Sequence, residues 1–134
     1  MPLLVSARVP ASLGAIECIG EGFTALNYKL MTIAAAHGGG FPALYESGIV
    51  YRRERRGNER WQLATDLLRS GAGDCEDLSF YRAAELRMEG DPATVVIVPT
   101  RRGSYHAVVR HGDGAIEDPS RILLDLERGG STLR

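Results

Sequence analysis

The sequence predicts an α+β fold in which N-terminal helices pack on an antiparallel sheet. Three patterns indicate this class. Apolar residues recur at helical spacing over about 20–36 and again after Cys75. A continuous β-branched run occupies 93–99, and two alternating segments flank a turn signal at 111–114. With 134 residues, the chain is expected to form one domain over 1–134.

The first half of the chain is expected to be mainly helical. Residues 3–9 alternate weakly, which predicts an N-terminal strand. The helix over about 20–36 ends at three consecutive glycines, residues 38–40. A strand is predicted to begin at Gly48, and residues 61–69 have the spacing of a two-turn helix.

The second half is expected to supply the sheet. The helix that opens at Cys75 ends before the stop-and-turn signal at 90–92. Residues 93–99 are apolar throughout, which predicts a buried strand. Residues 104–110 alternate as a second strand, and 115–118 form the return strand of the hairpin. The tail after Pro119 has one apolar patch and no predicted element.

Composition and charge exclude several classes of protein. Hydrophobic residues make up 44% of the chain and charged residues 25%, as in ordinary globular domains. A net charge of −1 gives no reason to expect nucleic acid as a partner. No apolar run approaches the roughly 18 residues of a membrane span, and the N-terminus lacks a signal-peptide pattern. We therefore expect a cytoplasmic or virion-associated protein without a nucleic-acid or membrane partner.

The most informative stretch is 71–79, in which two glycines and an aspartate directly precede a cysteine. Asp74 is a suitable N-cap, with Asp77 three residues later in the first turn. Cys75 would then hold the first helical position, where unpaired N–H groups and the helix dipole favour a thiolate. The acidic neighbours Asp74, Glu76 and Asp77 oppose this effect. A cationic partner would have to offset them.

A cysteine, a histidine and an aspartate follow one another along the chain in an order that suits nucleophilic catalysis. Such catalysis needs a thiolate, an imidazole beside it and a third group that orients the ring. Cys75 opens a helix, His106 lies on a predicted strand, and Asp118 ends the strand that pairs with it. The hairpin would bring residues 106 and 118 close together. The sequence thus predicts a Cys75–His106–Asp118 triad.

Other reactive or charged residues are expected to be structural. Cys18 has no turn signature around it and is predicted to be a buried small hydrophobe. His37 and His111 are given structural roles. The basic run 52–56 could bind an acidic partner, but nearby carboxylates favour a solvated face.

Three segments resemble the transglutaminase-like cysteine peptidase superfamily, with its papain-like fold. They are Gly73-Asp74-Cys75-Glu76-Asp77-Leu78, Tyr105-His106-Ala107-Val108-Val109 and Ile116-Glu117-Asp118-Pro119-Ser120. The chain is most similar to small members encoded by phages or prophages, and the resemblance covers a core of about 44–124. It implies a cysteine-bearing helix packed on an antiparallel sheet that carries the histidine and aspartate. It also implies that Cys75 is the nucleophile, His106 the base and acid, and Asp118 the residue that orients the ring.

The resemblance also suggests roles for residues around the triad. An oxyanion hole is required for acyl transfer, and the Cys75 backbone N–H is one natural donor. Gln62 or the indole N–H of Trp61 could be the second; core packing and surface exposure are the alternatives.

Some bacterial relatives bind calcium through acidic residues beside the cysteine. Asp74, Glu76 and Asp77 have suitable oxygen ligands, but helix capping and dipole compensation are favoured, so no cofactor is expected.

Two functions from different classes follow. The first is a cysteine-dependent amide or peptide hydrolase, or an acyl transferase, that acts on a protein or peptide. The second is a phage structural or assembly protein that retains the fold and binds a partner protein, such as a phage structural protein. A metal-binding module is the weakest reading, because the chain has only two cysteines and three histidines.

Overall fold

The computed structural model describes residues 13–53, 60–100 and 104–129. Within these ranges the chain forms four α-helices, one short 3-10 helix and five strands. In chain order they are α1 (Leu13–Ala36), η1 (Leu44–Glu46), β1 (Val50–Tyr51), α2 (Ala64–Ser70), β2 (Ala72–Gly73), α3 (Cys75–Met88), β3 (Thr94–Pro99), β4 (Tyr105–Arg110), β5 (Ile116–Glu117) and α4 (Pro119–Glu127). The predicted α+β class is confirmed. The predicted strand over 3–9 lies outside the described residues.

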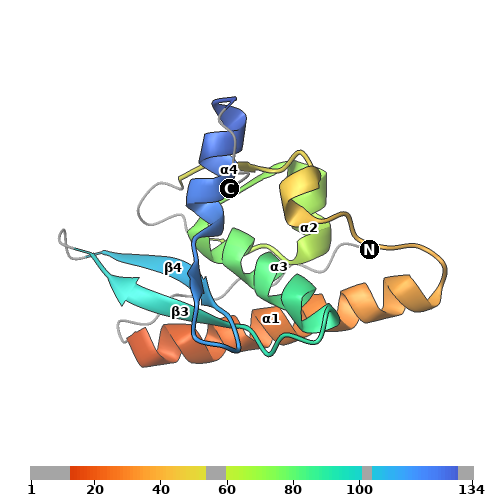
Figure 1. Ribbon diagram of the computed structural model, residues 1–134, viewed down its shortest axis with the longest axis horizontal. Coiled ribbons are helices and arrows are strands. Elements are labelled where there is room, and N and C mark those ends of the chain that lie inside the picture. The colour runs from red at the N-terminus through yellow and green to blue at the C-terminus, as the bar shows by residue number, and fades with distance from the viewer. Residues whose placement is uncertain (1–12, 54–59, 101–103, 130–134) are drawn as a thin grey trace.

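Helix α3 lies at the centre of the molecule, with α1 below it and α2 and α4 above it in the view of Figure 1. The antiparallel sheet has the strand order β3-β4-β5 and extends from one side of this helical layer. In its register Val98 pairs with His106, and Val109 pairs with Glu117. Helix α3 packs against β4, and α1 packs against both α3 and β3.

Helix α3 contributes to three apolar clusters, of which the two larger hold these layers together. One cluster joins α1, η1, α2 and α4, and includes the fully buried Leu67 and Tyr81. The other joins α1 to the sheet and contains Phe23, Phe80 and Cys75. Burial of this apolar surface is the main favourable contribution to folding. Every layer therefore depends on the side chains of α3.

Helix α1 ends where predicted but begins seven residues earlier than the predicted start at residue 20. Gly20 and Gly22 lie inside it, and they left its start uncertain in the sequence. The structure gives Gly20 a packing role: a Cβ atom at this position would lie 2.7 Å from Cε1 of the buried Phe80. The glycine lets α1 approach α3 closely, which offsets its low helix propensity.

Two elements, β2 and α4, were not predicted from the sequence. The strand predicted from Gly48 is only the two-residue β1, and it pairs in parallel with β2, directly before Cys75. Helix α4 occupies the tail that had no predicted element. Its signal was present: Asp118 is the N-cap, Pro119 is the first helical residue, and apolar positions follow.

Two predictions about burial are wrong. Cys18 is exposed, because it lies on the outer side of α1 rather than against the core. Strand β3 is not buried as a whole: Ile97 is buried, whereas Val98 is 37% exposed. An apolar run is fully buried only when both faces of its sheet are covered, and helix α1 covers one face of β3.

The basic run that begins at Arg52 is partly described. Arg52 is exposed and forms an ion pair of 3.0 Å with Glu127 of α4. Arg53 is also exposed, and residues 54–56 lie outside the described ranges. The two described arginines thus fit the expectation of a solvated face.

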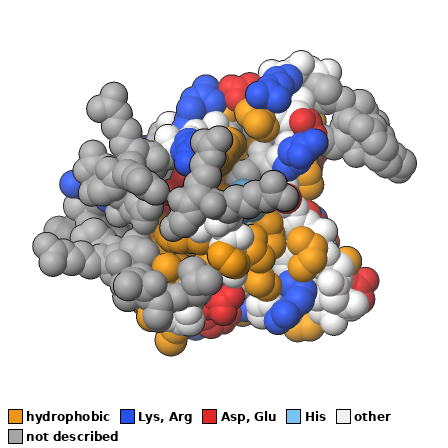
Figure 2. All heavy atoms as spheres, turned by 90° about the vertical axis from the view of Figure 1, so that its left-hand side faces the viewer, with side chains coloured by type: hydrophobic (Ala, Val, Ile, Leu, Met, Phe, Trp, Pro, Cys, Tyr) orange, Lys and Arg blue, Asp and Glu red, His pale blue; other side chains and the backbone are white. Residues whose placement is uncertain are grey.

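Hydrophobic side chains gather on the face at the sheet end of the molecule, with charged groups around them (Figure 2). Val98 and Ile116 are among the large hydrophobic residues exposed on the strands. Among the described helices, none is both long enough and apolar enough to cross a membrane.

The packing of Gly20 can be tested by a pair of alanine substitutions. Gly20→Ala should lower the free energy of unfolding by about 1–3 kcal/mol, because its methyl group would overlap the Phe80 ring. Gly22→Ala is the matched control: nothing lies within 4 Å of its Cβ position, and it should raise stability by roughly 0.5–1 kcal/mol. Urea denaturation measures both values. Equal effects of the same sign would show that Gly20 is not a packing residue.

Candidate active site

The cysteine is presented by a tight turn between α2 and α3. Gly71 ends α2 in the left-handed conformation, with φ of 78°, which glycine adopts without strain. The carbonyl groups of Gly71 and Gly73 accept hydrogen bonds from Val50 and Arg52, at 3.0 Å and 2.8 Å. The short parallel β1–β2 pair therefore fixes the backbone that enters α3.

Asp74 is the N-cap of α3, as the sequence predicted, and it forms a capping box with Asp77. The Asp74 carboxylate accepts the Asp77 backbone N–H at 3.2 Å, and the Asp77 carboxylate accepts the Asp74 N–H at 3.2 Å. Asp77 also accepts the backbone N–H of Gln62 at 2.7 Å. These bonds hold Cys75 at the first position of the helix.

The Cys75 thiol is buried, with 9% exposure, and it donates a hydrogen bond of 3.4 Å to Oε2 of Glu76. Burial is the largest cause that raises its pKa, and the negative charges of Glu76 and Asp74 raise it further. The backbone N–H of Ala107 acts in the opposite direction. The predicted stabilisation of a thiolate by the helix N-terminus is therefore outweighed. The resting group is a thiol.

His106 and Asp118 lie together as predicted. Nε2 of the His106 ring is 2.9 Å from Oδ2 of Asp118, and both side chains are partly exposed. The hydrogen bond to Asp118 raises the pKa of His106, against the effect of burial. Burial works to raise the pKa of Asp118, but its bond to His106 keeps that pKa below the ordinary value. Since Nε2 is engaged, Nδ1 is the ring nitrogen left for chemistry.

No hydrogen bond joins the Cys75 thiol to the His106 ring in the described part of the chain. Cys75 packs in the same apolar cluster as Ala107, the residue that follows His106 on β4. Side chains alternate along a strand, so His106 points away from the face that carries Ala107. Glu76 interacts with both groups. Its carboxylate accepts the hydrogen bond from the Cys75 thiol, and its negative charge raises the pKa of His106. The structure thus assembles the His106–Asp118 pair and leaves Cys75 bonded to Glu76.

The two residues suggested as oxyanion donors are engaged in packing and in the turn. Gln62 Nε2 donates to the Ala72 carbonyl at 2.9 Å and to Asp77 at 3.3 Å. Its side chain therefore braces the turn before the cysteine. Trp61 is 5% exposed and packs edge-on against Phe80, with ring centroids 5.1 Å apart. Its indole N–H is buried and has no hydrogen-bond partner among the described residues.

Two of the carboxylates beside Cys75 are engaged in the turn and in the helix cap. Both oxygens of Asp77 accept N–H groups of the turn, and Asp74 caps the helix. Burial and the neighbouring carboxylates raise the pKa of Asp74, which disfavours its charged form. Across the described ranges, no group of three or more His, Cys, Asp or Glu side chains could hold a metal ion.

A second polar cluster, which the sequence did not predict, lies where η1, α3 and β5 meet. It centres on Glu117, the last residue of β5. We call it the Glu117 cluster; its members are Tyr45, Arg82, Glu85, Asp91, His111 and Glu117. His111 bridges Asp91 at 2.7 Å and Glu117 at 2.8 Å, consistent with its predicted structural role. These two contacts raise the pKa of His111.

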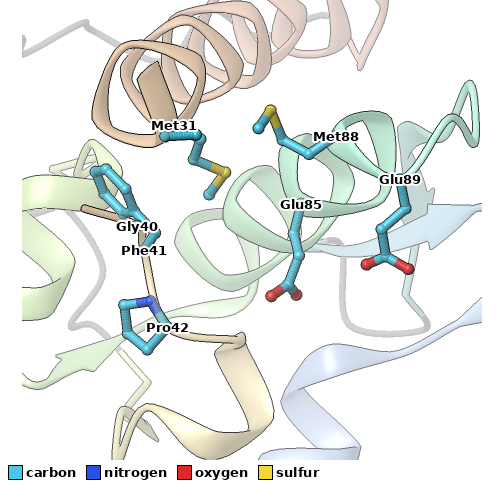
Figure 3. Close-up of a pocket in the computed structure, with 8 residues that line it drawn as sticks. Met31, Gly40, Phe41, Pro42, Glu85, Met88 and Glu89 are labelled. Carbon is cyan, nitrogen blue, oxygen red and sulfur yellow. The ribbon is translucent and has the colours of Figure 1, made fainter. Parts of the chain in front are cut away.

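A separate pocket of about 250 Å³ lies between α1, residues 40–42 and the end of α3. Met31 and Met88 contribute to its apolar wall, and the carboxylates of Glu85 and Glu89 point in the same direction from α3 (Figure 3). Its lining does not include the cysteine, the histidine or the aspartate of the predicted triad.

Comparisons of the chain with protein-family models, with curated protein sequences and with solved structures found no match. The candidate site is therefore defined here by its own geometry.

The effect of Glu76 on the thiol predicts the behaviour of a charge-neutral variant. Glu76→Gln should lower the pKa of Cys75, because the negative charge of Glu76 is, after burial, the largest cause of the raised pKa. At a pH below the pKa of the thiol, each unit by which that pKa falls increases the thiolate fraction about tenfold. The rate of iodoacetamide labelling against pH measures this. Cys18→Ser is the required background, because Cys18 is exposed and would react first.

Asp66→Asn removes a carboxylate from α2 that takes no part in this turn, and it should leave the labelling rate of Cys75 unchanged. If Glu76→Gln labels no faster than its parent, Glu76 does not hold the thiol in its protonated form.

The His106–Asp118 pair predicts a stability contribution confined to a pH window. The pKa of His106 is raised above 6.5, so its contribution is full below that pH and is lost as pH rises through the raised value. The pKa of Asp118 is lowered below 3.8, so its contribution is present above that pH and is lost as pH falls through the lowered value. The difference in unfolding free energy between wild type and Asp118→Asn should therefore peak between these two pH values.

Urea denaturation at a series of pH values measures this difference. Asparagine remains a good N-cap for α4, so the comparison isolates the pair. A difference that does not change with pH would contradict an ion pair.

Proposed function

We propose that this protein is a cysteine-dependent acyl-transfer enzyme, with peptide or amide hydrolysis as its leading reaction. The observation that carries the proposal is the His106–Asp118 contact of 2.9 Å, beside the strand residue on which Cys75 packs. An oriented imidazole next to a cysteine at a helix N-terminus is the arrangement that activates a thiol. The resemblance of the three sequence segments to transglutaminase-like cysteine peptidases supports the same function.

The proposed reaction begins when the Cys75 proton passes to Nδ1 of His106. The sulfur then attacks the carbonyl carbon of an amide, and a C–S bond forms. The protonated His106 returns the proton to the leaving amine as the C–N bond breaks. Water or a second amine then displaces the sulfur from the thioester, with His106 as base. Asp118 keeps Nε2 of the ring engaged throughout, so Nδ1 carries out both proton transfers.

This reaction requires the thiol to leave Glu76. The thiol must exchange the Glu76 oxygen for Nδ1 of His106, and because His106 lies on the strand face opposite Ala107, the two side chains must move toward each other. The resulting imidazolium would offset the negative charge of Glu76, which already acts on His106. The backbone N–H of Cys75, at the first helical position, is the natural donor to the oxyanion.

The substrate class follows from the chemistry and from the surface. The exposed hydrophobic side chains at the sheet end offer contact area for a protein or peptide (Figure 2). The resemblance to phage-encoded members suggests that the protein acts on phage or host proteins, in the host cytoplasm or in the virion.

Alkylation of Cys75 tests the proposal in the Cys18→Ser background. We expect His106→Ala to slow the iodoacetamide labelling of Cys75, because the imidazole is the base that would take the thiol proton. Mass spectrometry of the labelled peptide measures the rate. His37→Ala is the matched control, since His37 follows the far end of α1 and should not affect labelling.

A labelling rate no faster than that of free cysteine, and equal in His106→Ala, would remove the claim of an activated thiol. The same result would favour the second candidate function.

That second candidate is a protein-binding role, such as phage assembly, in which the fold is retained without chemistry. The burial of the Cys75 thiol and its bond to Glu76 favour this reading. Cys75→Ser separates the two functions, because serine keeps the size and the hydrogen bond but removes the sulfur nucleophile. If the partner is bound or assembled normally by the serine variant, the chemistry is dispensable.

A further inference from the structure

Strand β5, which directly precedes Asp118, is very short. Strand β5 contains two residues, and they pair with Val109 and Arg110 of β4. Asp118 follows directly, as the N-cap of α4. Two ladder pairs at a sheet edge give limited backbone support. Side-chain contacts must therefore contribute to the position of Asp118.

Glu117, the residue before Asp118, supplies such contacts from three directions. Its carboxylate accepts a hydrogen bond from Nε of Arg82 at 2.6 Å and from the hydroxyl of Tyr45, and it lies 2.8 Å from Nε2 of His111. Burial works to raise the pKa of Glu117, but the bonds from Arg82 and Tyr45 hold it below the ordinary value. Partly buried, charge-assisted bonds of this kind hold their geometry closely.

The two neighbouring side chains serve opposite faces of the strand. Glu117 pairs with Val109, whose side chain packs on Ala83 and Leu86 of α3, and it reaches Arg82 on the same helix. Side chains alternate along a strand, so Asp118 points to the other face, where it meets His106. A displacement of Glu117 would move Asp118 with it.

Arg82 also connects this strand to the cysteine. It lies seven residues after Cys75, about two turns along the same helix. Its guanidinium binds Glu117 through Nε and Glu85 through Nη1, at 2.6 Å and 2.9 Å. One ion pair thus joins the helix that begins with Cys75 to the strand that directly precedes Asp118.

We propose that Glu117 is a positioning residue that sets the contact between Asp118 and His106, through its ion pair with Arg82. The catalytic meaning of this role rests on the function proposed above. The role itself concerns the geometry of a histidine–aspartate pair and can be measured without any activity.

The test measures the pKa of His106 by NMR titration of its ring proton, with Asp118→Asn as the reference for a lost contact. Glu117→Gln should reproduce most of the fall that Asp118→Asn causes, because Asp118 is no longer held against the ring. Arg82→Lys should lower the pKa in the same direction; it keeps the positive charge but loses the planar fork.

Glu85→Gln is the matched control. It removes a carboxylate that contacts the same guanidinium from α3 rather than from β5, so the pKa of His106 should stay at the wild-type value. An equal fall in Glu85→Gln would mean that only the local charge matters, and it would overturn the proposal. A wild-type value in Glu117→Gln would overturn it as well.

Circular dichroism shows whether Glu117→Gln folds; if it does not, the charge-conserving Arg82→Lys decides by the same criterion. Failure of the enzyme proposal has a different signature. In that case labelling of Cys75 is independent of His106, while the response of the His106 pKa to Glu117→Gln is unaffected.

Discussion

The burial of helix α3 is the constraint on which the rest of the structure depends. Ten of its fourteen residues are buried, and they include charged and polar groups as well as apolar ones. A buried charge is costly unless it is paired and hydrogen-bonded. Most of these groups are matched: Asp74 and Asp77 cap the start of the helix, and Arg82 binds Glu117 and Glu85, whereas Glu76 has the Cys75 thiol as its donor. The same constraint shapes the cysteine.

The state of the thiol follows from the relative size of two effects. A helix N-terminus stabilises an anion by about 0.3–1 kcal/mol at the surface and up to about 2 kcal/mol in partly buried sites. Removal of an anion from water next to other carboxylates costs considerably more. Cys75 is buried and bonded to Glu76, so the thiol is favoured. For the proposed enzyme, activation therefore means a change of proton partner.

The His106–Asp118 pair and the Glu117 cluster are adjacent sets of contacts, because Glu117 and Asp118 are neighbours in the chain. Two consecutive residues serve the two faces of the sheet: Glu117, the last residue of the strand, is held by α3, and Asp118, which follows it, holds His106. These side-chain contacts fix the position of a short edge strand that has only two backbone ladder pairs with β4. It also links the cysteine helix and the histidine strand by side-chain contacts outside the site, so that their relative placement does not rest on a contact between thiol and imidazole.

The sequence by itself determined what depends on local order: the α+β class, the capped helix opening at Cys75, the hairpin, and the approach of Asp118 to His106 across it. Each is set by residues close in the chain or by strand alternation. Only the tertiary structure decided the protonation of Cys75, the parallel β1–β2 pair, the exposure of Cys18 and the partners of His111. These features depend on which distant side chains exclude water or approach a charge, and no local pattern carries that information.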